Sequence, residues 1–435
     1  MKRHMHTFLA GARSRLLPAS VPFRFFGAAC VYHVLAWVAL FAGADQFPHF
    51  SGGLGWPLAA LHLVTLGVLA MTAMGASLQL LPVATRQAVF ALRAPAVIWW
   101  IYTPGVAALA LGMGTGNTLV LAGGATSVVA ALAAYGALLA HNLYGARGMP
   151  AVIAHGWVAL VSLAVLLVTA LSLVYAYVGL PILARPLALA LHVPFAAYGF
   201  MSMLILGLSC VLVPMFALSP AIDERSVLVS CTLAAIALLG VGVAAFGVTP
   251  ERLRIAALVI GSVAVVLHLR LMRHALATGI RRALGGSFVL VRIAWGLLLA
   301  SLLAVLGIVL ELPIAGLPTL FGVLLIAGWL LTILVGLLQR ILPFLASMHA
   351  IPGSRRPPTP STLTAPRPLA IHFYCHLAAL CCLAVATVTD SPHLTRTAAA
   401  IGLAGALAFA AFFAIVLWRR SHPVAMAPVR TATVA

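Results

Sequence analysis

Acidic residues are almost absent from this sequence: Asp and Glu together account for six of its 435 residues. Charged residues of both signs make up 7%, whereas a soluble domain has about 25%. This composition excludes a globular protein of the aqueous phase. Cysteine is also scarce. The six cysteines lie in apolar stretches and form no CxxC pair, which argues against both a disulfide framework and a zinc site.

Apolar residues dominate instead, at 64% of the chain. Twelve apolar runs reach about 20 residues, the length that crosses the hydrocarbon core of a bilayer. Backbone groups in lipid must be satisfied within each segment, so we expect helices. The predicted fold class is an all-α polytopic membrane protein, with spans at 24–43, 57–82, 94–113, 118–141, 152–178, 187–217, 228–247, 255–272, 286–310, 316–345, 369–389 and 398–418.

The net charge of +19 follows the predicted topology. Twenty-one of the 25 Lys and Arg residues fall on the side of the two termini, and Arg185, Arg252, Arg254 and Arg396 fall on the other. By the positive-inside rule, both termini are predicted to be cytoplasmic, in the inner membrane of a bacterium. The basic residues indicate topology and contact with anionic membrane lipids, and they do not indicate nucleic-acid binding.

A Gly-x7-Gly-x6-Pro pattern recurs three times, each time inside an apolar run. The copies are Gly67, Gly75 and Pro82, then Gly199, Gly207 and Pro214, then Gly328, Gly336 and Pro343. Their spacing of 132 and 129 residues holds about four spans each, which predicts three pseudo-repeated four-helix units. Within a copy, both glycines lie on one broad helix face, where small residues let a neighbouring backbone approach closely.

The predicted organisation follows this repeat. A basic cytoplasmic segment, 1–23, precedes unit 1 (24–147), unit 2 (148–283) and unit 3 (284–418), and a cytoplasmic tail covers 419–435. Unit 3 contains a stretch rich in Pro, Ser, Thr and Arg at 347–368, which is typical of a disordered linker.

Two histidines, His62 and His192, stand near the predicted outer ends of the first two glycine-bearing spans. A polar side chain at this depth favours a functional role, and imidazole is a good ligand for haem iron or copper. An interhelical hydrogen bond is the alternative interpretation. His62 precedes its glycine by five residues and His192 by seven, so the two are not copies of one position.

Three further histidines are weaker candidates for metal ligands. His372 and His376 are spaced i,i+4 on one helix, which is compatible with shared coordination, and His33 lies midway along the first span. Most histidines near the cytoplasmic face flank arginines at span ends, which favours interfacial anchoring for His141, His155, His268, His274 and His349. No carboxylate lies deep in a predicted span, so the sequence shows no carboxylate relay for protons.

These features lead to a family resemblance. Twelve spans in three units, with HLVTLG at His62 and HVPFAAYG…VPMF at His192, resemble the haem–copper oxidase subunit I superfamily. The sequence is similar to small single-subunit members and, more distantly, to NnrS-type proteins. The resemblance implies a pseudo-threefold twelve-helix fold, with His62 in the place of a low-spin haem ligand and His192 nearest to a copper ligand.

The sequence departs from the pattern that this family implies. The seventh span contains no histidine for copper, and Phe321 and Val323 stand where repeat symmetry would place histidines in the tenth span. A b-type haem at His62 is therefore the expected cofactor, while copper lacks the usual ligand set. A standard oxidase or nitric oxide reductase is not expected.

Three functions remain open from the sequence. In the first, the chain is a haem-binding relative of the oxidases that relays electrons, responds to nitric oxide or handles haem. In the second, it is a carrier or assembly factor for haem or copper. In the third, it is a structural subunit that pairs with another membrane protein. The predicted outer loops carry four acids and four arginines, a balance that favours no docking of cytochrome c.

Overall fold

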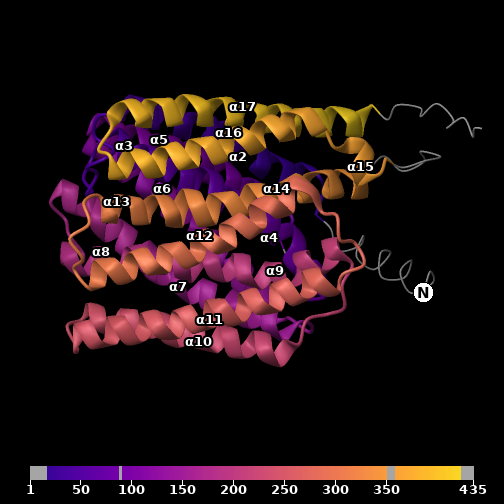
Figure 1. Ribbon diagram of the computed structural model, residues 1–435, viewed down its shortest axis with the longest axis horizontal. Helices are drawn as coiled ribbons and strands as arrows, with labels where there is room; N and C mark the ends of the chain where they lie inside the picture. The colour runs from indigo at the N-terminus through magenta and orange to yellow at the C-terminus, as the bar shows by residue number, and fades with distance from the viewer. Residues whose placement is uncertain (1–16, 88–90, 350–357, 423–435) are drawn as a thin grey trace, which may run out of the picture.

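The computed structural model describes residues 17–87, 91–349 and 358–422, and all regular structure within these ranges is helical (Figure 1). Nine of the membrane-length helices are α2 (Ser20–Ala42), α5 (Ala94–Thr115), α6 (Thr118–Tyr144), α7 (Pro150–Tyr175), α10 (Glu224–Ala245), α11 (Pro250–Thr278), α12 (Gly285–Val309), α16 (Pro366–Val388) and α17 (Pro392–Ser421). Two short helices complete the set: η2 (Ala176–Val178), which continues α7, and α15 (Pro360–Leu363).

The other three membrane-length helices each contain a π-helical segment, in which the backbone turn is wider than in an α-helix. We call them the central helices. They are α3, η1 and α4 (Trp56–His62, Leu63–Ala70, Met71–Ala84), then α8, η3 and α9 (Arg185–Pro194, Phe195–Ser202, Met203–Ala217), then α13, η4 and α14 (Leu317–Gly322, Val323–Leu331, Thr332–Met348).

All twelve predicted spans correspond to helices that are long and apolar enough to cross a membrane. The observed helices extend further than the apolar runs where charged residues follow. Helix α11, for example, includes Arg252 and Arg273, which lie outside the predicted span 255–272. Hydropathy detects the segment inside the hydrocarbon, whereas the helix continues into the polar interface.

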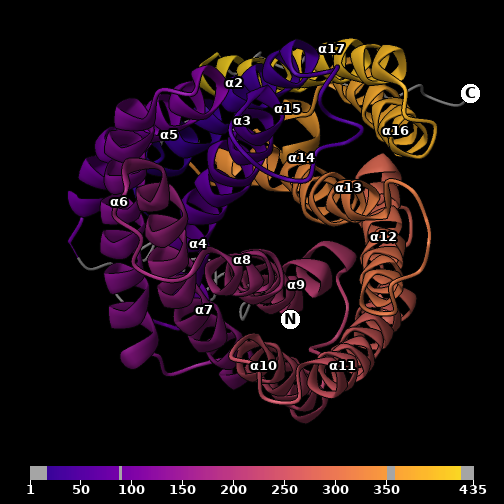
Figure 2. The same ribbon diagram turned by 90° about the vertical axis from the view of Figure 1, so that its left-hand side faces the viewer.

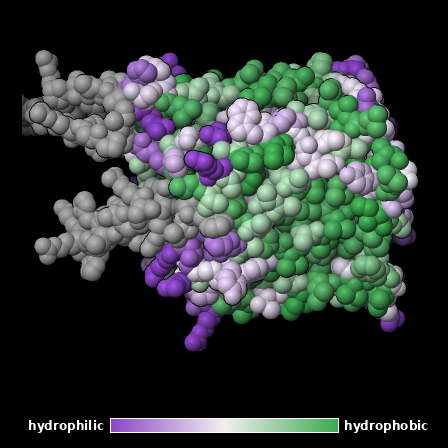
Figure 3. Space-filling view, turned by 180° about the vertical axis from the view of Figure 1, so that it is seen from behind, coloured by the Kyte–Doolittle hydropathy of each residue, from purple (hydrophilic) through white to green (hydrophobic). Residues whose placement is uncertain are grey.

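The surface supports a multi-pass membrane location. On the face shown in Figure 3, hydrophobic residues cover the middle of the molecule and hydrophilic residues gather at the two ends of the helices. The six acidic residues all lie at or beyond helix ends. They are Asp45, Asp223, Glu224, Glu251, Glu311 and Asp390.

Viewed along the helices, the three central helices are surrounded by the other nine (Figure 2). Neighbouring outer helices contact one another around this ring, and α17 packs on α2, so the last span closes the ring against the first. Segments η1 and η3 both contact η4, which brings the three π-helical segments together at the centre.

The glycine pattern sets the contact between each central helix and the helix that precedes it. A Cβ atom on Gly67 would lie 2.6 Å from Cβ of Tyr32, and one on Gly75 would lie 2.8 Å from Cβ of Phe25. The second pair, Gly199 and Gly207, faces Ser162 and His155 in the same way. Real Cβ atoms do not approach this closely, so glycine is what permits the contact.

The third central helix repeats this register. A Cβ atom on Gly328 would lie 3.2 Å from Leu297, and one on Gly336 would lie 2.9 Å from the carbonyl oxygen of Ser287 and 3.2 Å from Cβ of Leu290. In all three helix pairs, the two contacted residues are therefore seven positions apart (25 and 32, 155 and 162, 290 and 297). The three glycine pairs thus occupy equivalent positions in three antiparallel helix contacts.

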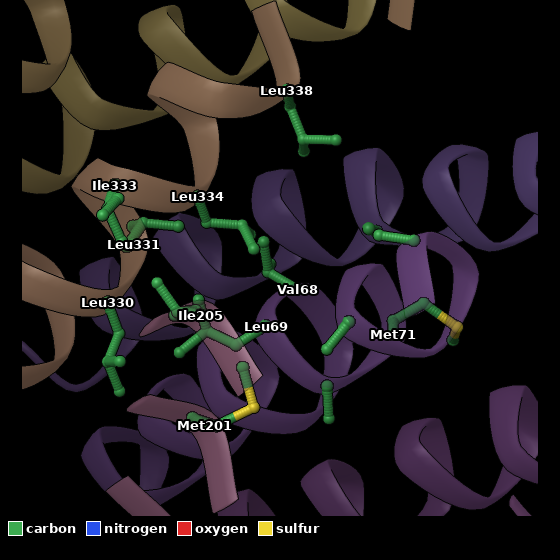
Figure 4. Close-up of a cluster of buried hydrophobic side chains, with 14 of the residues drawn as sticks. Val68, Leu69, Met71, Met201, Ile205, Leu330, Leu331, Ile333, Leu334 and Leu338 are labelled. Carbon is green, nitrogen blue, oxygen red and sulfur yellow. The ribbon is translucent and has the colours of Figure 1, made fainter. Parts of the chain in front are cut away.

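The space between the central helices is filled by apolar side chains. Figure 4 shows Val68, Leu69 and Met71 from the first central helix beside Met201 and Ile205 from the second, with Leu330, Leu331 and Leu334 from the third. Because these side chains are buried, the centre of the fold is a packed core.

The first and last described residues lie at the same end of the bundle, which we call the terminal end. His349 contacts the carbonyl oxygen of Leu17 through Nε2 at 3.0 Å, and Arg420 donates to the carbonyl of His349 at 3.3 Å. At the opposite end, Arg396 and Asp45 form an ion pair at 2.6 Å that joins α17 to the residues after α2.

The sequence predicted a disordered linker at 347–368, but helices occupy both edges of this stretch. Helix α14 continues to Met348, α15 occupies Pro360–Leu363, and α16 begins at Pro366. Arg419 donates to the carbonyl oxygens of Thr362 and Thr364, which ties this stretch to α17. Composition did not reveal these contacts, because they come from a helix more than 50 residues later. Residues 350–357 lie outside the described ranges, as do 1–16 and 423–435 of the predicted terminal segments.

Candidate cofactor sites

His62 ends α3, immediately before the π-helical segment η1. Its Nδ1 lies 3.0 Å from the carbonyl oxygen of Leu58, one helical turn earlier. A carbonyl oxygen only accepts a hydrogen bond, so Nδ1 carries the proton and Nε2 of the neutral ring retains its lone pair. Metal-binding histidines are oriented in this way, with one ring nitrogen held by a carbonyl and the other directed at the metal.

His192 lies in α8, three residues before the π-helical segment η3. Its Nδ1 is 3.4 Å from Oγ1 of Thr169 on α7. Thr169 donates its single hydroxyl proton to the carbonyls of Val165 and Leu166, so it accepts from His192. His192 therefore also presents the lone pair of Nε2.

The fold places these two histidines at the same end of the bundle. Each lies shortly before the π-helical segment of a central helix, His62 by one residue and His192 by three. Both side chains are half-buried. The arrangement places two neutral ligand nitrogens on one side of the bundle centre, near the end opposite the chain termini.

The third central helix adds no ligand at this depth. Val323 is buried at the first position of η4, and Phe321 precedes it in α13. Helix α10 (Glu224–Ala245), the seventh span, contains no histidine. The imidazoles present can therefore supply one axial ligand to a haem, at His62. They are too few for a haem that faces a copper ion held by several imidazoles.

A second group of imidazoles lies deeper in the bundle. His33 of α2 and His372 of α16 have ring centroids 6.2 Å apart, and the rings of His372 and His376 are 5.6 Å apart. We call these three residues the α2–α16 histidine cluster. All three are buried, with His33 3% and His372 1% exposed. The sequence marked them only as weak candidates, because their packing partner is a helix more than 300 residues away.

Hydrogen bonds fix two tautomers within the α2–α16 histidine cluster. Nδ1 of His372 donates to the carbonyl of Gly405 at 3.1 Å, which leaves a lone pair on its Nε2. Thr332 donates to the carbonyl of Ala327, so it accepts from Nε2 of His376 at 2.8 Å. Nε2 of His33 and Nε2 of His372 find no hydrogen-bond partner among the described residues.

A third imidazole pair corrects the prediction of interfacial anchoring. His155 of α7 and His268 of α11 are 1% and 0% exposed, and their ring centroids lie 6.2 Å apart. Both nitrogens of His268 lack a partner within the described ranges. Arg147 before His155 and Arg270 after His268 are exposed, whereas the two histidines face each other between α7 and α11.

The remaining histidines of that group lie at the terminal end of the bundle. His141 and His274 are exposed, near the ends of α6 and α11, and His349 follows α14. His349 joins Leu17 to the third central helix, so it has a structural role. Within the described residues, no three His, Cys, Asp or Glu side chains lie close enough together to enclose a metal ion.

Comparison with solved structures identifies the fold. The chain is similar to a haem–copper terminal oxidase whose dimer was determined by cryo-EM, with a TM-score of 0.60. The match covers 95% of this chain and 86% of the oxidase chain, at 11% sequence identity. The chain therefore has the fold of haem–copper oxidase subunit I, as the sequence predicted. No family model and no curated protein matches the sequence.

Proposed function

We propose that this chain binds a b-type haem through His62 and does not reduce dioxygen or nitric oxide at a haem–copper centre. The observation that carries the proposal is the orientation of His62. Its Nδ1 is held by the carbonyl of Leu58, so Nε2 is available as an axial ligand. His192 offers a second neutral imidazole at the same end of the central helices, for the same haem or for a metal.

The residues around His62 define what such a site would do. A bound haem would supply one-electron chemistry at its iron. The Leu58 carbonyl holds the imidazole in one tautomer and one orientation. Apolar side chains fill the space between the central helices (Figure 4), and neither Val323 nor Phe321 can take or give a proton.

Two features favour a role other than oxygen reduction. A binuclear centre needs several imidazoles around copper, and the seventh and tenth spans offer none. Oxygen reduction also consumes protons, and the six acids all stand at or beyond helix ends. We therefore infer a role in electron relay, nitric oxide response or haem handling, as in a non-catalytic, NnrS-like relative of the oxidases.

We further propose that the three central helices mark three repeated units, since their glycine pairs share one packing register. The excess of Lys and Arg on one side supports a cytoplasmic location for the terminal end, in a bacterial cell. An electron donor or a partner membrane subunit would then approach from either face of the inner membrane.

The optical spectrum of the full chain, purified in detergent from haem-replete cells, tests the proposal. A Soret band, with b-type α-bands after reduction, is expected for the wild type and not for His62→Ala. His268→Leu is the control, because it removes a buried imidazole from a different helix pair, α7 and α11, and should keep the spectrum.

Oxygen and nitric oxide consumption by the same preparation completes the test. No turnover above that of a haem-only control protein is expected. A colourless wild type would refute the haem assignment, and sustained oxygen reduction would refute the inferred loss of the haem–copper centre.

A further inference from the structure

The α2–α16 histidine cluster has unused ligand capacity in the middle of the bundle. Nε2 of His33 and Nε2 of His372 are both buried and have no partner in the part of the chain that the structure describes. A buried polar atom without a partner costs about 1–3 kcal/mol, so two on facing side chains need a physical reason. A ligand that accepts both lone pairs would provide one.

A small cavity adjoins His33, and Phe409 connects its lining to His372. It has a volume of about 10 Å³ and is lined by Cys30, His33 and Thr72, together with apolar side chains that include Phe409. The ring of Phe409 packs on His372, with centroids 4.9 Å apart. The hydroxyl of Thr72 also lacks a partner within the described ranges. The space suits one small ion or one water molecule, and it is far too small for a porphyrin.

The chemistry of the lining selects the ion. No carboxylate lies near the cluster, because the six acids stand at or beyond the helix ends, so hard cations such as Mg²⁺ or Ca²⁺ find no oxygen ligands of their kind. The cost of burying an ion in a medium of low dielectric constant rises with the square of its charge, which favours a monovalent ion. Imidazole and thiol ligands suit copper, and Cu(I) accepts two ligands in a line.

We propose that His33 and His372 bind one Cu(I) ion between α2 and α16. His33 contributes Nε2, and His372 contributes the lone pair that its bond to Gly405 leaves on Nε2. Thr332 holds His376 beside them, and the Cys30 thiol lines the same cavity. The site is separate from His62 and does not depend on haem binding there.

The ligand number agrees with this choice of ion. Since the described residues hold no group of three His, Cys, Asp or Glu side chains around one point, a tetrahedral Zn²⁺ site is not formed. Two imidazoles are enough for Cu(I), whose filled d shell imposes no higher coordination number. The site joins the first membrane-length helix to the eleventh, so a bound ion would also strengthen the closure of the ring.

Anaerobic titration of the full chain tests the proposal. Protein purified without a histidine tag is incubated with Cu(I) under ascorbate, with bicinchoninate as competing chelator, and bound copper is measured after desalting. The wild type is expected to retain about one Cu(I) more than His33→Leu or His372→Leu, whose affinity should fall at least about tenfold. His268→Leu is the matched control, since His268 is equally buried in a pair with the same 6.2 Å ring separation.

Elution volume and the unfolding temperature show whether each variant is folded, and His33→Gln and His372→Gln replace any leucine variant that is not. Cu(I) should raise the unfolding temperature of the wild type and of His62→Ala, and should leave that of the His33 and His372 variants unchanged. Loss of copper in these variants alone supports the site. No uptake by the wild type, equal uptake by all variants, or equal loss in His268→Leu overturns it.

Discussion

At the scale of the residue, the molecule places neutral imidazoles in its interior without any carboxylate to accompany them. His62, His155 and His372 each donate Nδ1–H to a backbone carbonyl, at 3.0, 2.8 and 3.1 Å. This bond fixes the tautomer and leaves Nε2 as an acceptor or ligand. Histidine thus acts here as an oriented nitrogen ligand, and its neutral form avoids the cost of a buried charge.

His268 is the exception, because neither of its nitrogens has a partner within the described ranges. Replacing it with leucine, which has a similar volume, removes two unpartnered polar atoms from a fully buried position. We expect His268→Leu to increase the free energy of unfolding by about 1–3 kcal/mol.

Denaturant unfolding in mixed micelles measures this change. His274→Leu serves as the control for an exposed histidine, and should change stability by less than about 0.5 kcal/mol. A destabilised His268→Leu would show instead that His268 has a polar ligand in the native protein.

At the scale of the element, the three central helices are distinguished by their π-helical segments. Hydroxyl groups accompany two of them: Ser202 donates to the carbonyl of Ala197, and Thr332 donates to that of Ala327, each five residues earlier. Trp329 of η4 also donates to Ser202 of η3 at 2.9 Å. The wide turns therefore do more than bend the helices, since they connect the central helices by side-chain hydrogen bonds.

The close helix contacts predict that Gly→Ala substitutions differ strongly in their effect on the free energy of unfolding. Gly67→Ala and Gly199→Ala would place Cβ atoms 2.6 and 2.5 Å from atoms of Tyr32 and Ser162. We expect each to lower the free energy of unfolding by about 1–3 kcal/mol. Gly123→Ala, where no atom lies within 4 Å, should be neutral or stabilising by up to about 1 kcal/mol.

The same micelle unfolding assay compares the three variants. Equal effects at Gly67, Gly199 and Gly123 would mean that helix propensity, and not the close backbone approach, explains the recurring glycines.

The sequence was sufficient to predict the helices and the glycine pattern, but not the π-helical segments. Runs such as Leu63–Ala70 have no residue type that separates a π turn from an α turn, and the wide turn depends on packing between the central helices. The sequence also indicated His62 and His192, because a histidine in an apolar run is conspicuous. It did not indicate the pairing of His33 with His372 or of His155 with His268, since contacts between helices leave no local pattern.

At the scale of the whole molecule, the fold is a closed ring of helices around three central ones (Figure 2). The contact between α2 and α17 completes it, with Trp37 packed against Gly402, where a Cβ atom would lie 2.4 Å from the indole. The ion pair of Arg396 with Asp45 lies at the same contact. A haem–copper terminal oxidase of known structure has the same fold at 11% sequence identity, so two very different sequences adopt this architecture.

The even number of spans and the distribution of Arg predict the orientation of the ring. Ser51 and Ser421 are exposed at opposite ends of the bundle, and each is replaced by cysteine in a variant whose six native cysteines are replaced by alanine. A membrane-impermeant maleimide applied to intact spheroplasts should label the first and not the second. Labelling of Ser421→Cys alone would reverse the proposed topology.

The central claim is that an oxidase fold here holds haem through a single retained histidine. Quantitation of haem b per chain, by the pyridine haemochrome of wild type and His62→Ala from the same haem-replete host, tests it most directly. We expect about one haem per wild-type chain and almost none in the variant. A wild type without haem, or a His62→Ala variant with the full amount, would contradict it.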